Sequence, residues 1–406
     1  MEKLKAKQKI INDPVYGFIT INHPLLFDII AHPYYQRLRR IHQMALAYLV
    51  YPGAVHTRLH HSLGAYHLMC LALNELKSKG VEITKEEEIA TKAAILLHDI
   101  GHGPFSHALE EEFLSGIGHE ELSLHIMKKL NVLFNGQLDL CIQIFTNQYH
   151  KKFLSQLVSG QLDVDRMDYL TRDSYFTGVS EGVIGYDRIL KMLVVHNNEL
   201  MVEEKGIYSI EKFLIARRLM YWQAYLHKAV LAAEEMLVKI LKRVKEICNS
   251  DKESVKTGSG TDYFLFEFNG VINDEVIERF CEIDDIDFEF AIKKWSKHSD
   301  FILSTLCKGI LNRNLFKVKF QPNEIDATIL QKKQSDIAVK YNISASDAEY
   351  LVFKGHITNT IYNTQNEKIN ILFKDGSVKD ISSIEDTLIH KTITNPVKKI
   401  YICSIE

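Results

Sequence analysis

ILLHDIGHGPFSH, at residues 95–107, is the stretch of this chain that says most about its fold. It begins inside an apolar run, Ala93–Leu97, that is typical of a buried helix. That helix carries an imidazole, His98, and a carboxylate, Asp99, side by side into the protein interior. An unpaired carboxylate is costly to bury, and a metal ion would both neutralise the acid and bind the two neighbours. The stretch therefore predicts a helical protein built around a metal centre.

Two further residues complete a ligand set of mixed nitrogen and oxygen atoms. One lies in TRLHHSLG and the other in GQLDVDRMDYL, so the predicted ligands are His61, His98, Asp99 and Asp165. Such a set suits Fe, Mn, Zn, Co or Ni better than Ca²⁺, with Mg²⁺ as an additional ion. Nine of the 18 histidines lie between residues 56 and 125, several of them in apolar helices, which favours a metal centre over isolated core histidines.

The bulk composition is that of an ordinary globular protein. The 406 residues are 46% hydrophobic and 25% charged, with a net charge of −3, so no global positive field attracts nucleic acid. The six cysteines are scattered and form no CxxC pair, which indicates reduced thiols. No apolar stretch reaches the length of a signal peptide or a membrane span. We therefore expect a cytoplasmic protein with no membrane partner, and nucleic acid is not indicated.

The periodicity of the apolar residues predicts a mainly α-helical fold with a small C-terminal α+β module. Helices are expected over 24–42, 58–80, 119–133, 137–160, 163–172 and 208–247, and from a capping box at Thr84–Glu87 to His98. Residues 248–262 are polar and predict a loop. Beyond residue 315, alternating apolar residues predict strands, and FKDGS predicts a hairpin turn. The expected units are an N-terminal segment of strands and a helix (1–57), a helical metal-binding domain (58–315) and the α+β module (316–406).

Side chains near the predicted ligands indicate phosphate chemistry. Histidine titrates near neutral pH, and the candidates for proton transfer are His102, His107 and His119. Basic residues near the ligands, or on helices expected to face them, are Arg58, Arg166, Arg172, Arg217 and Lys228. Guanidinium groups suit phosphate oxygens, so a metal with converging basic residues indicates a phosphate ester. Candidates for holding a sugar and a base are Gln43, Tyr169, Asp173 and Tyr225. Tyrosines at helical spacing more often pack in the core, which is the alternative for the last group.

Seven motifs of this chain occur together and in order: INDPVYGFITINHPLL, YQRLRRIHQ, VYPGAVHTRLHHSLGAYHL, LLHDIGHGPFSHALE, GQLDVDRMDYLTRDSYFTG, AYLHK and NRNLFK. Together they resemble the HD-domain deoxynucleoside triphosphate triphosphohydrolases, and the likeness runs from about Lys9 to Lys317. It is closest to the animal enzymes that join a sterile-alpha-motif domain to an HD domain, without the sterile-alpha-motif domain. The resemblance implies metal-dependent hydrolysis of a deoxynucleoside triphosphate (dNTP) to deoxynucleoside and triphosphate. It also implies a homo-oligomer, either a dimer or a tetramer.

The resemblance implies roles for individual residues. It assigns metal binding to His61, His98, Asp99 and Asp165, and catalysis to His119, with His102, His107 and Arg58 at the triphosphate. The other basic residues implied to bind substrate are Arg166, Arg217 and Lys228. Around the sugar and base it places Gln43, Tyr169, Asp173 and Tyr225. Gln43 and Tyr169 would exclude a 2′-hydroxyl and bind the 3′-hydroxyl.

The chain departs from the family at the sites where nucleotide activators bind the animal enzyme. Residues that match parts of those sites are Lys9, Asn12, Gln36, Arg39, Arg313 and Lys317. However, Ala31 replaces the Asp that binds guanine, and Glu203 and Gln223 replace arginines. A carboxylate in place of an arginine repels phosphate, so we expect a constitutive enzyme or a different anionic activator. Two other functions stay open: a phosphatase or phosphodiesterase acting on another nucleotide, and a non-catalytic nucleotide or nucleic-acid sensor.

Overall fold

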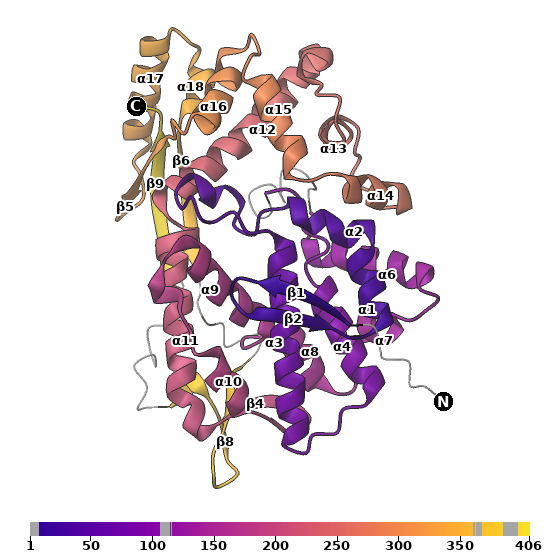
Figure 1. Cartoon of the computed structure of the whole chain (residues 1–406). Helices are drawn as coiled ribbons and strands as arrows, with labels where there is room; N and C mark the ends of the chain where they lie inside the picture. Colours follow the sequence, from indigo (N-terminus) through magenta and orange to yellow (C-terminus); the bar gives the residue numbers. More distant parts are fainter. Residues whose placement is uncertain (1–7, 106–113, 115, 360–361, 363–367, 385–396) are drawn as a thin grey trace.

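The computed structural model describes residues 8–105, 114, 116–359, 362, 368–384 and 397–406. It shows a helical body with small sheets at its edges, which confirms the mainly α class with a small C-terminal α+β part (Figure 1). Among the described residues, none of the helices combines the length and the apolar character needed to cross a bilayer.

An N-terminal hairpin precedes the helical body. Its strands are β1 (Lys9–Asp13) and β2 (Gly17–Ile21), and Figure 1 shows the hairpin in front of the central helices. The single helix predicted over 24–42 is wrong, since the chain forms α1 (Pro24–Ala31), α2 (Pro33–Gln36) and a 3₁₀ turn (Arg37–Arg40). Pro33 explains the break, because proline has no N–H to continue a helix.

Three helices at the centre carry the predicted ligands. They are α3 (Arg58–Ser78), α4 (Lys85–Leu97) and α9 (Val164–Thr177), and α3 packs against both of the others. The capping box at the start of α4 is present as predicted, with Thr84 and Glu87 bonding each other's backbone N–H groups at 3.2 and 2.8 Å. The ranges predicted for these helices agree with the structure to within a few residues, apart from α9, which runs five residues further.

For the helices around this centre, the ranges predicted from the sequence agree less well with the structure. The predicted helix 119–133 is confirmed as α6 (His119–Leu133). The helix predicted over 137–160 is wrong, because the chain forms α7 (Asp139–Phe145) and α8 (Lys152–Val158), with Asn147 at φ +54° between them. Further along lie α10 (Tyr186–Met192), β3 (Leu193–His196) and β4 (Glu199–Glu203).

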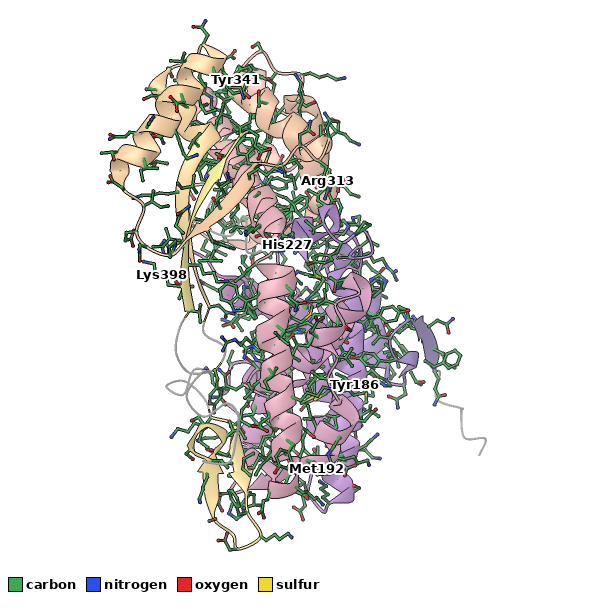
Figure 2. The ribbon with its side chains drawn as sticks, turned by 90° about the vertical axis from the view of Figure 1, so that its left-hand side faces the viewer. Tyr186, Met192, His227, Arg313, Tyr341 and Lys398 are labelled. Carbon is green, nitrogen blue, oxygen red and sulfur yellow. The ribbon has the colours of Figure 1, made fainter. Side chains whose placement is uncertain are left out.

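The 40-residue helix predicted over 208–247 is also wrong. The chain forms α11 (Ile207–Met220), a π-helical turn (Tyr221–Tyr225) and α12 (Lys228–Val255). The break falls at His227, which is the N-cap residue of α12: its Nδ1 accepts the N–H of Ala229 at 3.2 Å. Figure 2 shows His227 at the junction of the two helices. The loop predicted over 248–262 is right in part. Residues 248–255 count to α12, but the helix is kinked at Asp251, whose φ of −147° and ψ of 77° are not helical. Residues 256–260 lie outside helices, and α13 (Thr261–Phe266) follows.

The C-terminal strands belong to two separate sheets. After α14 (Asp274–Glu282), α15 (Asp285–Trp295) and α16 (Phe301–Leu311), β5 (Lys317–Gln321), β9 (Val397–Ser404) and β6 (Val352–Asn359) form one sheet in that spatial order. Two further helices, α17 (Ala327–Tyr341) and α18 (Ala345–Leu351), lie between β5 and β6 in sequence. The predicted Asp-Gly hairpin joins β7 (Asn370–Leu372) to β8 (Val378–Asp380), and β7 pairs in parallel with β4 at the opposite end of the molecule (Figure 1).

Candidate active site

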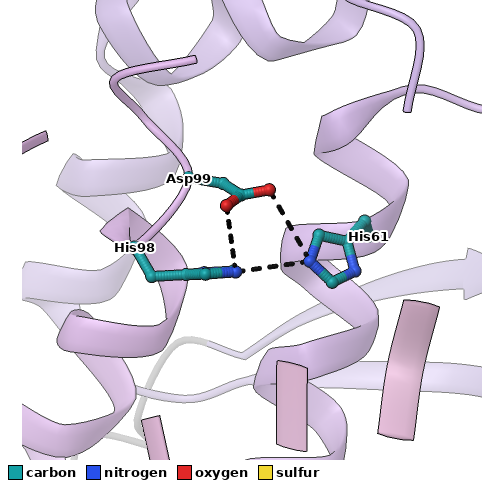
Figure 3. A group of neighbouring side chains, drawn as sticks. All are labelled: His61, His98 and Asp99. Atoms are coloured by element: carbon teal, nitrogen blue, oxygen red, sulfur yellow. Dashed lines mark hydrogen bonds and ion pairs between the residues drawn. The ribbon is translucent and has the colours of Figure 1, made fainter. Parts of the chain in front are cut away.

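The structure brings the four predicted metal ligands together. His61 lies in the first turn of α3, His98 ends α4, Asp99 follows it, and Asp165 lies in the first turn of α9. The two Nε2 atoms of the histidines are 3.3 Å apart. Asp165 Oδ1 lies 3.0 Å from Nε2 of His61 and 3.5 Å from that of His98, and Asp99 approaches the same two atoms at 3.7 and 3.3 Å. Figure 3 shows His61, His98 and Asp99 facing one point.

The partners of the other ring nitrogens direct both Nε2 atoms inward. Nδ1 of His61 lies 2.8 Å from Oδ2 of Asp168, and Nδ1 of His98 lies 2.7 Å from the carbonyl oxygen of Ile95. Each Nδ1 faces an acceptor, so the neutral ring donates there and presents the Nε2 lone pair to the cluster. Two lone pairs and two carboxylates around one point require positive charge between them. The donor set therefore fits a divalent cation, and its mixture of imidazole and carboxylate groups suits a transition metal.

The electrostatics of the cluster lead to the same conclusion. Burial lowers the pKa of His61, but hydrogen bonds with Asp165 and Asp168 outweigh burial and raise this pKa to about 10. Burial raises the pKa of Asp99, but His98, His102 and Arg58 outweigh it and hold this pKa well below its usual range. Without a metal ion, a proton on His61 thus supplies the positive charge, and a bound cation would replace that proton.

Two of the three predicted proton-transfer histidines lie beside the cluster. His102 is buried, its Nε2 lies 3.3 Å from Oδ1 of Asp99, and its ring stacks on His119 with centroids 4.0 Å apart. Burial and the neighbouring Arg58 hold the pKa of His102 well below its usual range, so this ring is neutral at pH 7. His107, the third candidate, lies outside the described residues.

The predicted phosphate-binding residues divide into groups. Arg58 is buried and its Nη1 donates to Oδ2 of Asp99 at 2.6 Å. The loop before α9 holds two others: Arg166 Nε donates to the carbonyl of Gly160 at 2.6 Å, and Arg217 Nη1 donates to Oε1 of Gln161 at 3.4 Å. Lys228, at the start of α12, instead lies against the C-terminal sheet, with its Nζ 5.6 Å from the ring centre of Phe320 in β5.

The expectation that Arg172 faces phosphate is wrong. Its side chain is fully buried, with Nε 3.0 Å from Oδ2 of Asp168 and Nη1 2.8 Å from Oδ2 of Asp13. Helical spacing from Asp168 gives a signal for the first contact in the sequence. Asp13 has no such signal, because it lies in β1, far from α9 in sequence.

The candidate sugar-binding residues gather further along α9. The carboxylate of Asp173 accepts from the hydroxyl of Tyr225 at 2.7 Å and lies 2.7 Å from Nε2 of His56. Tyr169 is one turn before Asp173, and its ring centre lies 6.4 Å from that of Tyr225. Among the described residues, Oε1 of Gln43 is buried with no hydrogen-bond partner. Gln43 and His56 are joined by a backbone hydrogen bond of 3.0 Å, which brings the two segments together.

His56 is a site residue that the sequence interpretation missed. Its side chain is buried and stacks on Phe176 of α9, with ring centres 4.5 Å apart. The loop that carries it lies close to α9, since a Cβ on Gly53 would come 2.5 Å from the carbonyl oxygen of Phe176. The only sequence signal for His56 is its place in VYPGAVHTRLHH, two residues before Arg58. The sequence interpretation gave the stretch to the ligand His61 and left His56 without a role.

The six residues that match activator sites lie in two places. Near the hairpin and α1, Lys9 Nζ lies 5.3 Å from the ring centre of Phe27, Gln36 Nε2 donates to the carbonyl of Ile30 at 2.6 Å, and Arg39 Nε donates to Gln36 Oε1 at 2.7 Å. Asn12 is exposed on β1. Near the C-terminal sheet, Arg313 Nε donates to the carbonyl of Leu49 at 2.5 Å and Lys317 Nζ lies 3.8 Å from a carboxylate oxygen of Glu406.

Comparisons with known proteins agree with this geometry. Residues 58–173 match the HD domain, and residues 184–267 match the HD associated region. A phosphohydrolase from Bacteroides thetaiotaomicron is 48% identical, with a TM-score of 0.94 over 98% of this chain and 100% of that one. The uncharacterized protein YwfO of Bacillus subtilis is 32% identical over 93% of this chain and 88% of that protein.

A more distant relative has a named activity. The deoxynucleoside triphosphate triphosphohydrolase SAMHD1 of Gallus gallus is 30% identical over 58% of this chain and 45% of that protein. The HD domain match covers His61, His98, Asp99 and Asp165, the four side chains that the structure brings together. The chain therefore belongs to the HD-domain phosphohydrolase family.

Proposed function

We propose that this protein hydrolyses dNTPs to deoxynucleoside and triphosphate at the cluster of His61, His98, Asp99 and Asp165. The observation that carries the proposal is the order of side chains along α9. From its first turn onward the helix presents Asp165 to the metal cluster, then Tyr169, and then the buried carboxylate of Asp173 with two donors around it. One helix therefore links a metal centre to a buried carboxylate suited to accept from hydroxyl groups, as a nucleotide requires.

The reaction is a displacement at the α-phosphorus. A water molecule attacks and gives up a proton to bulk solvent, the bond from phosphorus to the 5′-oxygen breaks, and the leaving oxygen takes a proton from His119, which solvent then reprotonates. The products are a deoxynucleoside and triphosphate. A bound divalent cation would polarise the phosphate and lower the pKa of a coordinated water toward about 7. Arg58, Arg166 and Arg217 would bind the phosphate oxygens through their guanidinium groups.

The sugar end would select the substrate. The Asp173 carboxylate and Oε1 of Gln43 are acceptors for the 3′-hydroxyl, and the ring of Tyr169 would occupy the space that a 2′-hydroxyl needs. Resemblance to SAMHD1 of Gallus gallus supports this choice of substrate. The residues that depart from the activator site, Ala31, Glu203 and Gln223, support a constitutive enzyme. The Glu203 carboxylate is engaged within the chain, at 2.9 Å from Nζ of Lys79 and 2.7 Å from Nζ of Lys205.

The test is product analysis with the full chain. Each dNTP and each ribonucleoside triphosphate is incubated separately, as the sole nucleotide, with protein loaded with Mn²⁺ or Fe²⁺, and ³¹P NMR identifies the phosphate product. We expect inorganic triphosphate from dNTPs only. A nucleoside monophosphate with pyrophosphate would indicate a nucleotide pyrophosphohydrolase, and a nucleoside diphosphate with free phosphate would indicate a phosphatase; either contradicts the proposal. His98→Ala should abolish turnover, whereas His150→Ala, which removes an exposed histidine, should not.

A further inference from the structure

A chain of buried charged groups connects the metal cluster to the N-terminal hairpin. Oδ2 of Asp168 faces Nδ1 of His61 at 2.8 Å and accepts from Nε of Arg172 at 3.0 Å. On its other side, the same guanidinium donates to both carboxylate oxygens of Asp13, at 2.8 and 3.3 Å. The side chains of Asp168 and Arg172 are 0% exposed and that of Asp13 is 4% exposed. Water therefore screens these contacts little.

The far end of this chain is part of the hairpin turn. Asp13 is the last residue of β1, and its Oδ1 accepts the N–H groups of Val15 and Tyr16 at 3.0 Å each. The ring centre of Tyr16 lies 5.4 Å from the guanidinium carbon of Arg172. The Asp13 carboxylate therefore both closes the hairpin turn and holds Arg172. The position of Asp13 in turn depends on how the hairpin packs on the helical body.

The net charge of these buried groups favours a cation on the far side of the His61 ring. Two carboxylates and one guanidinium leave one buried negative charge, which is costly unless a positive charge lies nearby. The charge faces Nδ1 of His61, and the proposed cation lies at Nε2 of the same ring. The packing is also tight, because a Cβ on Gly64 of α3 would come 2.0 Å from Oδ1 of Asp168 and 2.1 Å from Nη2 of Arg172.

We propose that Asp13 and Arg172 are positioning residues of the metal centre. They hold Asp168 where it accepts the Nδ1 proton of His61, so metal affinity depends on the seating of the N-terminal hairpin. Groups that hydrogen-bond a ligating histidine orient its ring and raise its basicity, and losing one lowers metal affinity about 10–100-fold. The inference rests on the proposed metal centre but not on the identity of the substrate.

The test is a titration of the metal-free full chain with Mn²⁺ alone, with free Mn²⁺ measured by electron paramagnetic resonance. Asp13→Asn keeps the Oδ1 acceptor of the turn but removes the charge that holds Arg172. We expect its Mn²⁺ affinity to fall about tenfold. Asp28→Asn is the matched control, because it removes an exposed carboxylate from neighbouring α1. Equal affinities for the Asp13→Asn and Asp28→Asn variants would overturn the inference.

A double-mutant cycle tests the route through Asp168. Asp168→Asn should lower Mn²⁺ affinity by up to about a hundredfold, and adding Asp13→Asn should then cost little more. Fully additive losses would show that Asp13 does not act through Asp168 and would overturn the route. If Asp13→Asn fails to fold, Arg172→Lys replaces it, because lysine keeps the charge but cannot bind two carboxylates with a planar fork.

The outcomes separate this inference from the proposed function. A parent that binds Mn²⁺ but releases no triphosphate from dNTPs contradicts the substrate and leaves the inference standing. A parent that binds no Mn²⁺ contradicts both. A loss of thermal stability in Asp13→Asn with unchanged Mn²⁺ affinity would show a purely structural role and would contradict the inference alone.

Discussion

Helix α9 carries a carboxylate at each end of the candidate site, and the two have opposite surroundings. Asp165 faces imidazole nitrogens whose other ring nitrogens are already engaged, so a cation bound at this end would replace the proton that His61 otherwise holds. Asp173 faces two proton donors, the hydroxyl of Tyr225 and the ring of His56, which already satisfy part of its charge. The same residue type on one helix therefore suits a cation at one end and hydroxyl groups at the other, according to the partners that other segments supply.

Removing a ligand at the metal end should have the largest effect. Asp165→Ala and His98→Ala should each lower Mn²⁺ affinity by more than about a hundredfold, since even the loss of an outer partner reaches that value. Activity should fall to background while circular dichroism keeps the helical signal. Asp187→Ala, on the exposed side of α10, is the control. Full turnover by Asp165→Ala would contradict the assignment of a catalytic cation to the Asp165 end of the site.

Arg58→Ala should distinguish the metal-free from the metal-loaded protein. Its guanidinium and the Asp99 carboxylate form a buried pair at 2.6 Å, and breaking such a pair costs about 3–5 kcal/mol. We expect that loss in chelator, and a smaller one with bound metal, because the cation then compensates Asp99. Thermal unfolding with and without Mn²⁺ measures the difference. Catalysis should still fall about 10²-fold with metal bound. An equal shift in unfolding temperature under both conditions would contradict the prediction.

At the sugar end, Asp173→Asn should leave metal binding intact. We expect kcat/KM for dNTPs to fall about 10–100-fold, the loss typical of a hydrogen bond to a charged group. Mn²⁺ affinity should match that of the parent, since the contacts of Asp173 are with His56 and Tyr225 rather than with the ligands. His56→Ala should produce a smaller loss of the same kind. If either variant weakens Mn²⁺ binding, the two ends are not independent.

The smallest effect is expected at a second histidine–aspartate pair, which lies outside the candidate site: its loss should change only how stability depends on pH. Nδ1 of His42 lies 2.7 Å from Oδ2 of Asp285, and this hydrogen bond outweighs burial and raises the pKa of His42 above 6.5. A raised pKa in the folded state contributes stability below the unfolded value, and that stability is lost as pH rises through the folded pKa. Urea unfolding from pH 6 to 9 should show this loss in the parent and not in His42→Gln. Identical pH profiles would contradict it.

The sequence predicted the metal end better than its surroundings. His98 and Asp99 are adjacent and close an apolar helix, so their convergence follows from local structure. The burial of Arg172 could not be predicted in this way, because one of its partners, Asp13, comes from a distant strand. The break at His227 depends on a π-helical turn, and helical periodicity alone predicts continuation. The expected unit 316–406 likewise gave no sign that β7 pairs with β4.

That pairing has a consequence during synthesis on the ribosome. Val202 of β4 finds its partner, Ile371 of β7, only when roughly 170 more residues have been translated, which takes on the order of ten to thirty seconds. For that time the free edge of β4 offers unpaired backbone groups to any other extended chain. The nascent polypeptide is therefore exposed to pairing with other chains at this edge from the time β4 has been synthesised until β7 arrives.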